Sequence, residues 1–202
     1  MKKVGNPNHP KKGSQIKVDW SVDPIKKLKD IKAIKKILAN KPRDLALFAI
    51  GINTNLRASD LLRLKVGQVK DLKAGDTVEN KEKKTGKVRM ITLNKTCTNA
   101  IQNLLASKQY QDDDYLFQSQ RRHVLTTPSV HRLVKGWCSE NNLKGNYGSH
   151  TLRKTFGYQQ RVHFGVGLPE LMVCFNHSTQ KQTLDYLCIQ PEEVKNIYMN
   201  EL

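Results

Sequence analysis

Hydrophobic residues recur at intervals of three and four positions from Asp23 onward, with lysines filling many of the positions between them. This spacing is typical of an amphipathic helix with a lysine-rich outer face. Pro42 suits the first turn of a second helix over residues 43–53, because that turn needs no backbone N–H donor. Residues 45–52 are apolar nearly all round, so we expect this second helix at the centre of the core. The apolar residues of the first helix are Ile25, Leu28, Ile31, Ile34 and Leu38.

A short hairpin is predicted around Thr85-Gly86, where glycine supplies the positive φ of a tight turn between strands over residues 77–84 and 87–93. Ser149 is a suitable cap for a helix that runs to about residue 164, because its side-chain oxygen can accept a first-turn N–H. The fold class is therefore mainly α with a small antiparallel β-hairpin. The other predicted helices cover residues 96–108, 128–141, 168–175, 178–187 with Ser178 as cap, 191–199, and a short segment that Ser59 caps.

Positive charge dominates the 202-residue chain, which has a net charge of +17 and a pI near 9.8, so a polyanion is its natural partner. The first 41 residues hold twelve lysines against three acids, which is a little over half of that excess. We expect residues 1–22 to form an extended basic arm and residues 23–202 to form a single domain. Within the arm, the expected DNA contacts are Lys11, Lys12 and Lys17.

A polybasic protein of a membrane surface is the rival interpretation, and it is weaker. The chain has no lipidation motif and no basic amphipathic helix with an aromatic face, and its longest apolar run, eight residues, cannot span a bilayer. No apolar stretch follows the first lysines, so we expect no signal peptide and a cytoplasmic, nucleoid-associated protein. The cysteines form no Cys-x-x-Cys pair, which argues against zinc and disulfides and predicts reduced, buried thiols at Cys97, Cys138, Cys174 and Cys188.

Candidate chemistry concentrates between Ser149 and Tyr186. His150 and Arg153, three residues apart, share a face of the first turn of the predicted helix, where free N–H groups and the helix dipole favour a phosphate. On its own, such a His–Arg pair is more often two ordinary polar surface residues, and a lone tyrosine is more often part of a core. The ordered set carries more weight: Arg57, Lys84, His150, Arg153, His177 and Tyr186.

These residue types suit attack on a DNA phosphodiester. Two arginines can bind the charge that grows on the non-bridging oxygens. A tyrosine with a pKa near 10 needs a cationic site to become a nucleophile, and Lys84 can protonate the departing 5′ oxygen. His150 can act as base or donor and His177 as a further donor. We expect no metal and no cofactor, because the sequence has no obvious carboxylate cluster, and we expect Asp60 to orient a catalytic neighbour.

The ordered set resembles the catalytic constellation of the tyrosine recombinases, the phage integrase family, from about Lys41 to Ile189. The resemblance implies the catalytic-domain fold of DNA breaking–rejoining enzymes and metal-independent cleavage of one strand by Tyr186 through a 3′-phosphotyrosyl intermediate. It also implies a tetramer on double-stranded DNA, and we expect further DNA contacts from Lys87, Arg89 and Lys154. Four motifs carry the resemblance: Leu56-Arg57-Ala58-Ser59-Asp60, Lys84-Thr85-Gly86-Lys87, His150-Thr151-Leu152-Arg153, and Asn176-His177-Ser178 with Tyr186 nine residues after His177.

The chain departs from the family pattern before the first motif. Family members usually carry a separate helical domain that closes around DNA, and the forty or so residues before Lys41 are too few for it. We expect the basic arm or another chain to supply that grip. The sixteen residues after Tyr186 could dock on a neighbouring protomer or on their own domain. Two other functions stay open: a DNA-binding regulator without strand exchange, and a monomeric relaxer of DNA like the type IB topoisomerases.

Overall fold

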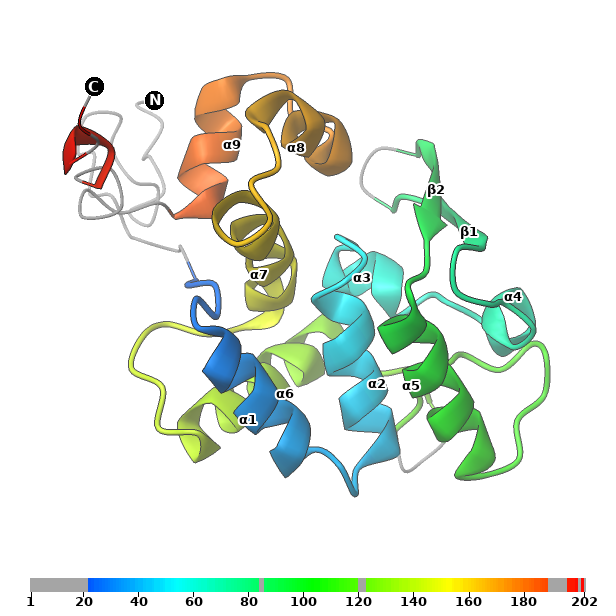
Figure 1. The fold of residues 1–202 in the computed structure, drawn as a ribbon. Helices are drawn as coiled ribbons and strands as arrows, with labels where there is room; N and C mark the ends of the chain where they lie inside the picture. The colour runs from blue at the N-terminus through cyan, green and yellow to red at the C-terminus, as the bar shows by residue number, and fades with distance from the viewer. Residues whose placement is uncertain (1–21, 84–85, 120–122, 189–195, 200, 202) are drawn as a thin grey trace, which may run out of the picture.

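A computed structural model describes residues 22–83, 86–119, 123–188, 196–199 and 201. The expected DNA contacts of the arm, the hairpin residue Lys84 and most of the segment after Tyr186 lie outside these ranges. Within the described ranges the chain is mainly helical, with one two-stranded antiparallel sheet, as the sequence predicts (Figure 1). None of the helices in these ranges is both long and apolar enough to pass through a bilayer.

The helix predicted at the centre of the core is there. Helix α2, Pro42–Gly51, has Pro42 in its first turn and buries seven of its residues. It packs against α1 (Leu28–Ile37), α5 (Lys95–Ala106) and α7 (Ser149–Val162). A Cβ atom at Gly51 would lie 2.6 Å from Leu152 Cδ1, so glycine is what lets α2 and α7 approach so closely.

The hairpin is shorter than predicted. Strand β1, Thr77–Lys81, pairs antiparallel with β2, Val88–Thr92, in a register that sets Thr77 opposite Thr92. Gly86 has a φ of 70°, as the predicted turn requires. Two single-turn helices precede the sheet, α3 (Ala58–Leu61) and α4 (Val66–Val69), and α6 (Thr127–Glu140) follows α5.

Helices α8, Leu168–Phe175, and α9, Gln180–Leu187, pack on α7 and on each other (Figure 1). Their buried residues Leu171, Phe175 and Leu187 form a small hydrophobic cluster separate from the main core. The hairpin lies beside α8: the Lys87 ammonium is 3.5 Å from Asn176 Oδ1 at the end of that helix. The last predicted helix, over residues 191–199, falls largely outside the described ranges, where only a 3₁₀ turn, Asn196–Met199, can be reported.

Three predicted helix starts are wrong by one or two residues. Ser149 and Ser59 are helical residues rather than caps, preceded by Gly148 and Arg57 at the cap positions. Helix α9 is capped by Thr179, not Ser178, and the Thr179 hydroxyl accepts the backbone N–H of Gln182 at 3.2 Å. At α9 the Thr179 hydroxyl already accepts a first-turn N–H, so Ser178 is not needed as a cap. At α7 the helix starts one residue earlier, and the Gly148 N–H donates to Thr151 Oγ1 at 3.0 Å.

The first helix also starts later than its apolar spacing suggests. Residues 23–27 are extended and are hydrogen-bonded along α7. The Ile25 N–H donates to Thr155 Oγ1 at 2.8 Å, Gln159 Nε2 donates to the Ile25 carbonyl at 3.0 Å, and Thr151 Oγ1 donates to the Asp23 carbonyl at 2.9 Å. Ile25 is buried, but its backbone binds α7 instead of entering α1.

The cysteine prediction holds for two residues of the four. Cys97 and Cys138 are buried, and burial raises the pKa of their thiols to about 11 and about 12. Cys174 and Cys188 are only half-buried, so the expectation of burial is wrong for them, because they lie at the ends of α8 and α9 rather than in the main core. All four are free thiols.

We predict that Gly157→Ala destabilises the protein. A Cβ atom there would lie 2.4 Å from Cζ of the fully buried Phe175, so α8 must shift away from α7. Overpacking of this kind lowers the free energy of unfolding by about 1–3 kcal/mol, measurable by urea denaturation. The matched control is Gly136→Ala on α6, where nothing lies within 4 Å and alanine should add about 0.5–1 kcal/mol. Equal stability of the two variants would contradict the close approach.

Candidate active site

Five of the six predicted catalytic residues are brought together by the fold, although four separate segments carry them. Their charges act on one another: Arg57 influences the pKa values of Arg153, His177 and Tyr186. The sixth, Lys84, lies outside the described residues. Arg57 lies at the end of the loop before α3, and His150 and Arg153 lie in the first turns of α7. His177 follows the left-handed residue Asn176 that ends α8, and Tyr186 lies on α9.

Tyr186 lies against the start of α7. Its hydroxyl oxygen is 3.5 Å from Nδ1 of His150, an exposed side chain in the first turn. The tyrosine ring packs on Phe175 with ring centroids 4.9 Å apart, and Cζ of Arg153 is 6.0 Å from the ring centroid. Helix α9 therefore places Tyr186 within reach of His150 and Arg153 on α7.

Two opposing effects act on the Tyr186 phenol. Burial raises its pKa to about 12, while Arg153 and Arg57 lower it. Burial is the larger effect, so Tyr186 is a protonated phenol at neutral pH. A base must take this proton when the oxygen attacks, and His150 Nδ1 is the described group within reach.

Arg153 is the most deeply buried cation of the cluster. Its side chain is 3% exposed, and Nη2 donates to the Phe175 carbonyl at 3.0 Å. Burial lowers its pKa to about 10, which leaves the guanidinium charged at neutral pH. The contact with Phe175 fixes Arg153 against the C-terminal end of α8, so its remaining N–H groups have a defined direction.

His177 is positioned by the way α8 ends. Asn176 adopts the left-handed conformation, with φ 55°, and the His177 N–H donates to the Met172 carbonyl at 2.9 Å. The imidazole then stacks on Phe175 with centroids 5.1 Å apart, and Nδ1 is 3.1 Å from the Thr183 hydroxyl. Burial, followed by the charges of Arg153 and Arg57, lowers its pKa to about 4, so the ring is neutral at pH 7.

Arg57 is held by two buried carboxylates. Its Nη1 lies 2.9 Å from Glu82 Oε2 and 3.9 Å from Asp60 Oδ2. Asp60 is 1% exposed, and its Oδ1 accepts the backbone N–H of Lys83 at 2.9 Å. Lys83 directly precedes Lys84 in the chain, and the orienting role of Asp60 remains a prediction.

Glu82 is the residue that sequence reasoning missed. It stands among lysines and resembles one more surface charge, yet it is 2% exposed and pairs with two arginines. A signal was present in the sequence. Val78 and Asn80 face inward from β1, and continued alternation places Glu82 on the same inner side.

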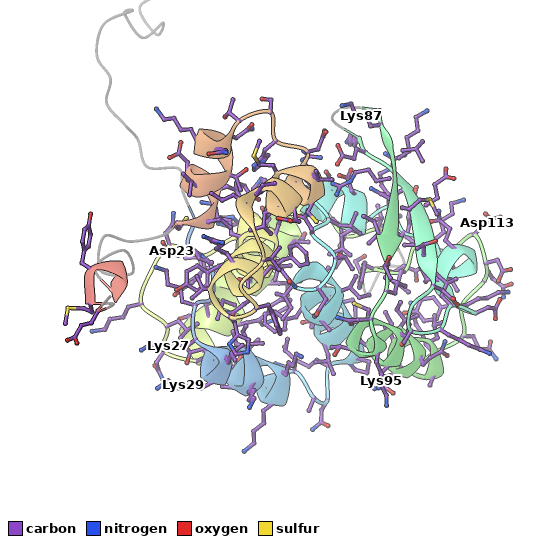
Figure 2. The ribbon with its side chains drawn as sticks, turned by 45° about the horizontal axis from the view of Figure 1, so that its top comes forward. Asp23, Lys27, Lys29, Lys87, Lys95 and Asp113 are labelled. Carbon is purple, nitrogen blue, oxygen red and sulfur yellow. The ribbon has the colours of Figure 1, made fainter. Side chains whose placement is uncertain are left out.

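The three further expected DNA contacts have different surroundings. These contacts are Lys87, Arg89 and Lys154. Lys87 is exposed at the tip of the hairpin, at the end of the molecule opposite to Lys27 and Lys29 (Figure 2). Arg89 is turned inward, donating to Glu82 Oε1 at 3.0 Å and to the carbonyl of Cys174. A DNA contact remains a prediction for each of the three.

Lys154 is also turned inward, and the residue is only 6% exposed. Its ammonium is 3.1 Å from Cys188 Sγ and 5.3 Å from the ring centroid of Tyr186. These contacts place the Lys154 ammonium beside the tyrosine. No group of three or more histidine, cysteine or acidic side chains in the described ranges is arranged to hold a metal ion.

Comparison with known proteins gives the context for this site. The sequence model of the phage integrase family matches residues 25–193. The chain belongs to the phage integrase family. It is 35% identical over 181 residues to "Probable integrase/recombinase YoeC" of Bacillus subtilis (strain 168), an alignment that covers 88% of this chain and 95% of that protein.

The chain spans only part of the length of three further similar proteins. A tyrosine recombinase XerC of Caldanaerobacter subterraneus subsp. tengcongensis is 29% identical over 159 residues, which is 77% of this chain and 44% of the relative. The XerA recombinase structure superposes with a TM-score of 0.72 at 19% identity, covering 89% of this chain and 63% of that one. The XerH recombinase bound to its palindromic difH substrate gives 0.70 at 21%, covering 84% and 49%. The predicted tyrosine recombinase fold is confirmed.

We predict that His177 stays neutral until the pH falls well below 6.5, the ordinary pKa of histidine, with a midpoint near 4. Because the unfolded chain takes up this proton first, the contribution of His177 to stability is present above pH 6.5 and is lost as the pH falls toward 4. NMR titration of the histidine ring resonances measures the midpoint, and His177→Asn identifies the signal. A midpoint at or above 6.5 would contradict the burial of this ring against Phe175.

Proposed function

We propose that this chain is a site-specific DNA recombinase that cleaves and rejoins one strand at a time through Tyr186, with a 3′-phosphotyrosyl intermediate. The observation that carries the proposal is the hydroxyl of Tyr186 at 3.5 Å from His150 Nδ1, with Arg57 and Arg153 both lowering the pKa of that phenol. The names of the relatives support recombination as the outcome, since they are integrases and tyrosine recombinases.

In the proposed cleavage step the phenol oxygen of Tyr186 attacks phosphorus, and its proton passes to His150. The bond from phosphorus to the 5′ oxygen breaks, and that oxygen takes a proton from Lys84. Rejoining runs the same steps backward with the 5′ hydroxyl of another strand as nucleophile. The 3.5 Å separation suits a DNA-free site, because catalytic hydrogen bonds often shorten only in the substrate complex.

The charge that grows on the non-bridging oxygens is stabilised by Arg57 and Arg153. Both guanidiniums are anchored on one side by protein acceptors, so their remaining donors are preorganised for a phosphate. His177 contributes as a neutral ring. With Nδ1 paired with the Thr183 hydroxyl, Nε2 is the nitrogen that would face a phosphate oxygen.

The remaining parts of the proposal concern partners. Double-stranded DNA is the substrate, several protomers assemble on two sites, with a tetramer as the expected state, and the protein works in the cytoplasm with the nucleoid. Residues 1–22 serve as a basic arm, and residues 23–202 as one catalytic unit. Support for DNA comes from the net charge of +17 and from the DNA-bound XerH structure.

We predict that Tyr186→Phe abolishes covalent attachment to DNA and leaves binding unchanged within a few-fold, because the hydroxyl serves the chemistry rather than affinity. The assay uses a pool of nicked duplexes with randomised sequence, in which a short 5′-hydroxyl fragment diffuses away and traps the adduct. Sequencing the attached DNA gives the target.

Tyr198→Phe is the matched control, since this tyrosine is 83% exposed in the 3₁₀ turn, and its adduct yield should equal that of the unchanged protein. An adduct that survives in Tyr186→Phe would contradict the proposal. DNA binding without any adduct in the unchanged protein would favour the regulator, and relaxation of supercoiled plasmid at many sites without synapsis would favour the relaxer.

We predict that the adduct forms at an undiminished rate in excess EDTA. The arginines stabilise the phosphate charge, and Lys84 protonates the leaving oxygen. In metal-dependent nucleases a metal ion performs these tasks. Activity that disappears on chelation and returns with Mg²⁺ would contradict this. A salt titration run in parallel separates loss of cleavage from loss of binding, since phosphate contacts weaken with rising ionic strength.

A further inference from the structure

We propose that Glu82 is a positioning residue for strand cleavage: its buried carboxylate holds Arg57 in the direction that meets the scissile phosphate. The inference rests on the proposed function, because it gives Glu82 a task only if Arg57 stabilises the charge of the transition state. Nothing in the motif set that identifies the family includes Glu82, which lies two residues before Lys84.

The side chain of Glu82 uses both oxygens on arginines of the site. Oε2 is 2.9 Å from Arg57 Nη1, and Oε1 is 3.0 Å from Arg89 Nη1. Glu82 is 2% exposed, whereas each arginine side chain is 20% exposed. The carboxylate is therefore buried, whereas parts of both arginine side chains remain accessible from outside.

The backbone of Glu82 closes the hairpin turn. Its N–H donates to the Lys87 carbonyl at 2.9 Å, and its carbonyl accepts the Gly86 N–H at 2.9 Å. These bonds join described residues that come before and after Lys84 in the chain. One residue thus ties Arg57, through its side chain, to the hairpin that carries the proposed general acid, through its main chain.

Stability alone does not account for a carboxylate at this position. A buried ion pair loses so much hydration that well-packed apolar residues often stabilise a fold as well or better. What the carboxylate provides is direction, because an ion pair at 2.9 Å through Nη1 restricts the orientation of the Arg57 guanidinium and leaves Nε and Nη2 for a phosphate. Such preorganisation matters where charge develops during the reaction, and Arg57 is placed there by the proposal.

The test compares Glu82→Gln with Arg57→Ala in single-turnover cleavage of the duplex recovered by the trapping selection. Glu82→Gln should slow cleavage about 10- to 100-fold, a part of the roughly 10²- to 10³-fold cost of losing a whole charge-stabilising donor. DNA binding should change less than about threefold, a small effect beside the loss in rate. Glu79→Gln is the matched control, because Glu79 lies on the exposed face of β1 and should leave the rate unchanged.

Two substituted phosphates separate positioning of Arg57 from other effects. A methylphosphonate replaces one non-bridging oxygen by methyl, and the stereoisomer on which Arg57→Ala loses least identifies the oxygen that Arg57 contacts. Glu82→Gln should lose least on the same stereoisomer. A 5′-bridging sulfur, which needs no general acid, should rescue Lys84→Ala and leave the defect of Glu82→Gln in place.

A double variant completes the test. In the Arg57→Ala background, Glu82→Gln should add no more than about a twofold loss, because residues that act through one another are not additive. Additive losses, or equal losses on both methylphosphonate stereoisomers, would overturn the inference, as would an unimpaired Glu82→Gln. Circular dichroism checks folding. If Glu82→Gln unfolds, Glu82→Asp decides, since it keeps the charge, shortens the reach and should show the same preference between stereoisomers.

Failure of this inference differs from failure of the proposed function. If the unchanged protein forms no tyrosyl adduct, the recombinase proposal fails. If it forms the adduct and Arg57→Ala is impaired while Glu82→Gln is not, only the role of Glu82 is wrong.

Discussion

The C-terminal end of α8 is the point on which the arrangement of positive charge depends. The last carbonyls of a helix lack partners within the helix and carry the negative end of its dipole, so they favour cations. Here Arg153 donates to the carbonyl of Phe175, and Arg89 donates to that of Cys174. The helix end fixes the direction of two guanidiniums, and these in turn hold α8 in place, so that His177 follows at a defined position.

Burial sets the protonation of the whole cluster. The same removal from water raises the pKa of Tyr186, lowers that of His177 and lowers that of Arg153, because in each case it disfavours the charged form. The arginine remains charged at neutral pH, while the histidine and the tyrosine remain neutral. The site therefore combines charged guanidiniums with a protonated Tyr186, an arrangement that suits the binding of an anion.

Much of the fold follows from apolar spacing, and the exceptions have physical causes. The central position of α2 was predictable because its residues are apolar nearly all round. Lys154 was expected to contact DNA, and its burial was not predicted. Helix α7 is enclosed by neighbouring helices and buries polar residues on several faces, so periodicity no longer separates inside from outside there. Glu82 was missed because charge masked strand alternation. Both exceptions are polar residues of the candidate site, where contacts with other site residues decide burial and local sequence patterns do not predict it.

The extended segment before α1 has a mechanical consequence. Residues 23–27 run along α7 and are hydrogen-bonded to Thr151, Thr155 and Gln159, which belong to the same helix as His150 and Arg153. Asp23 also exchanges two hydrogen bonds with Asn146 in the loop before α7, so a pull on Asp23 would load α7 and this loop before α1. Tension applied at Asp23 is therefore directed onto the helix that carries His150 and Arg153, so this segment works as a tether fixed to α7.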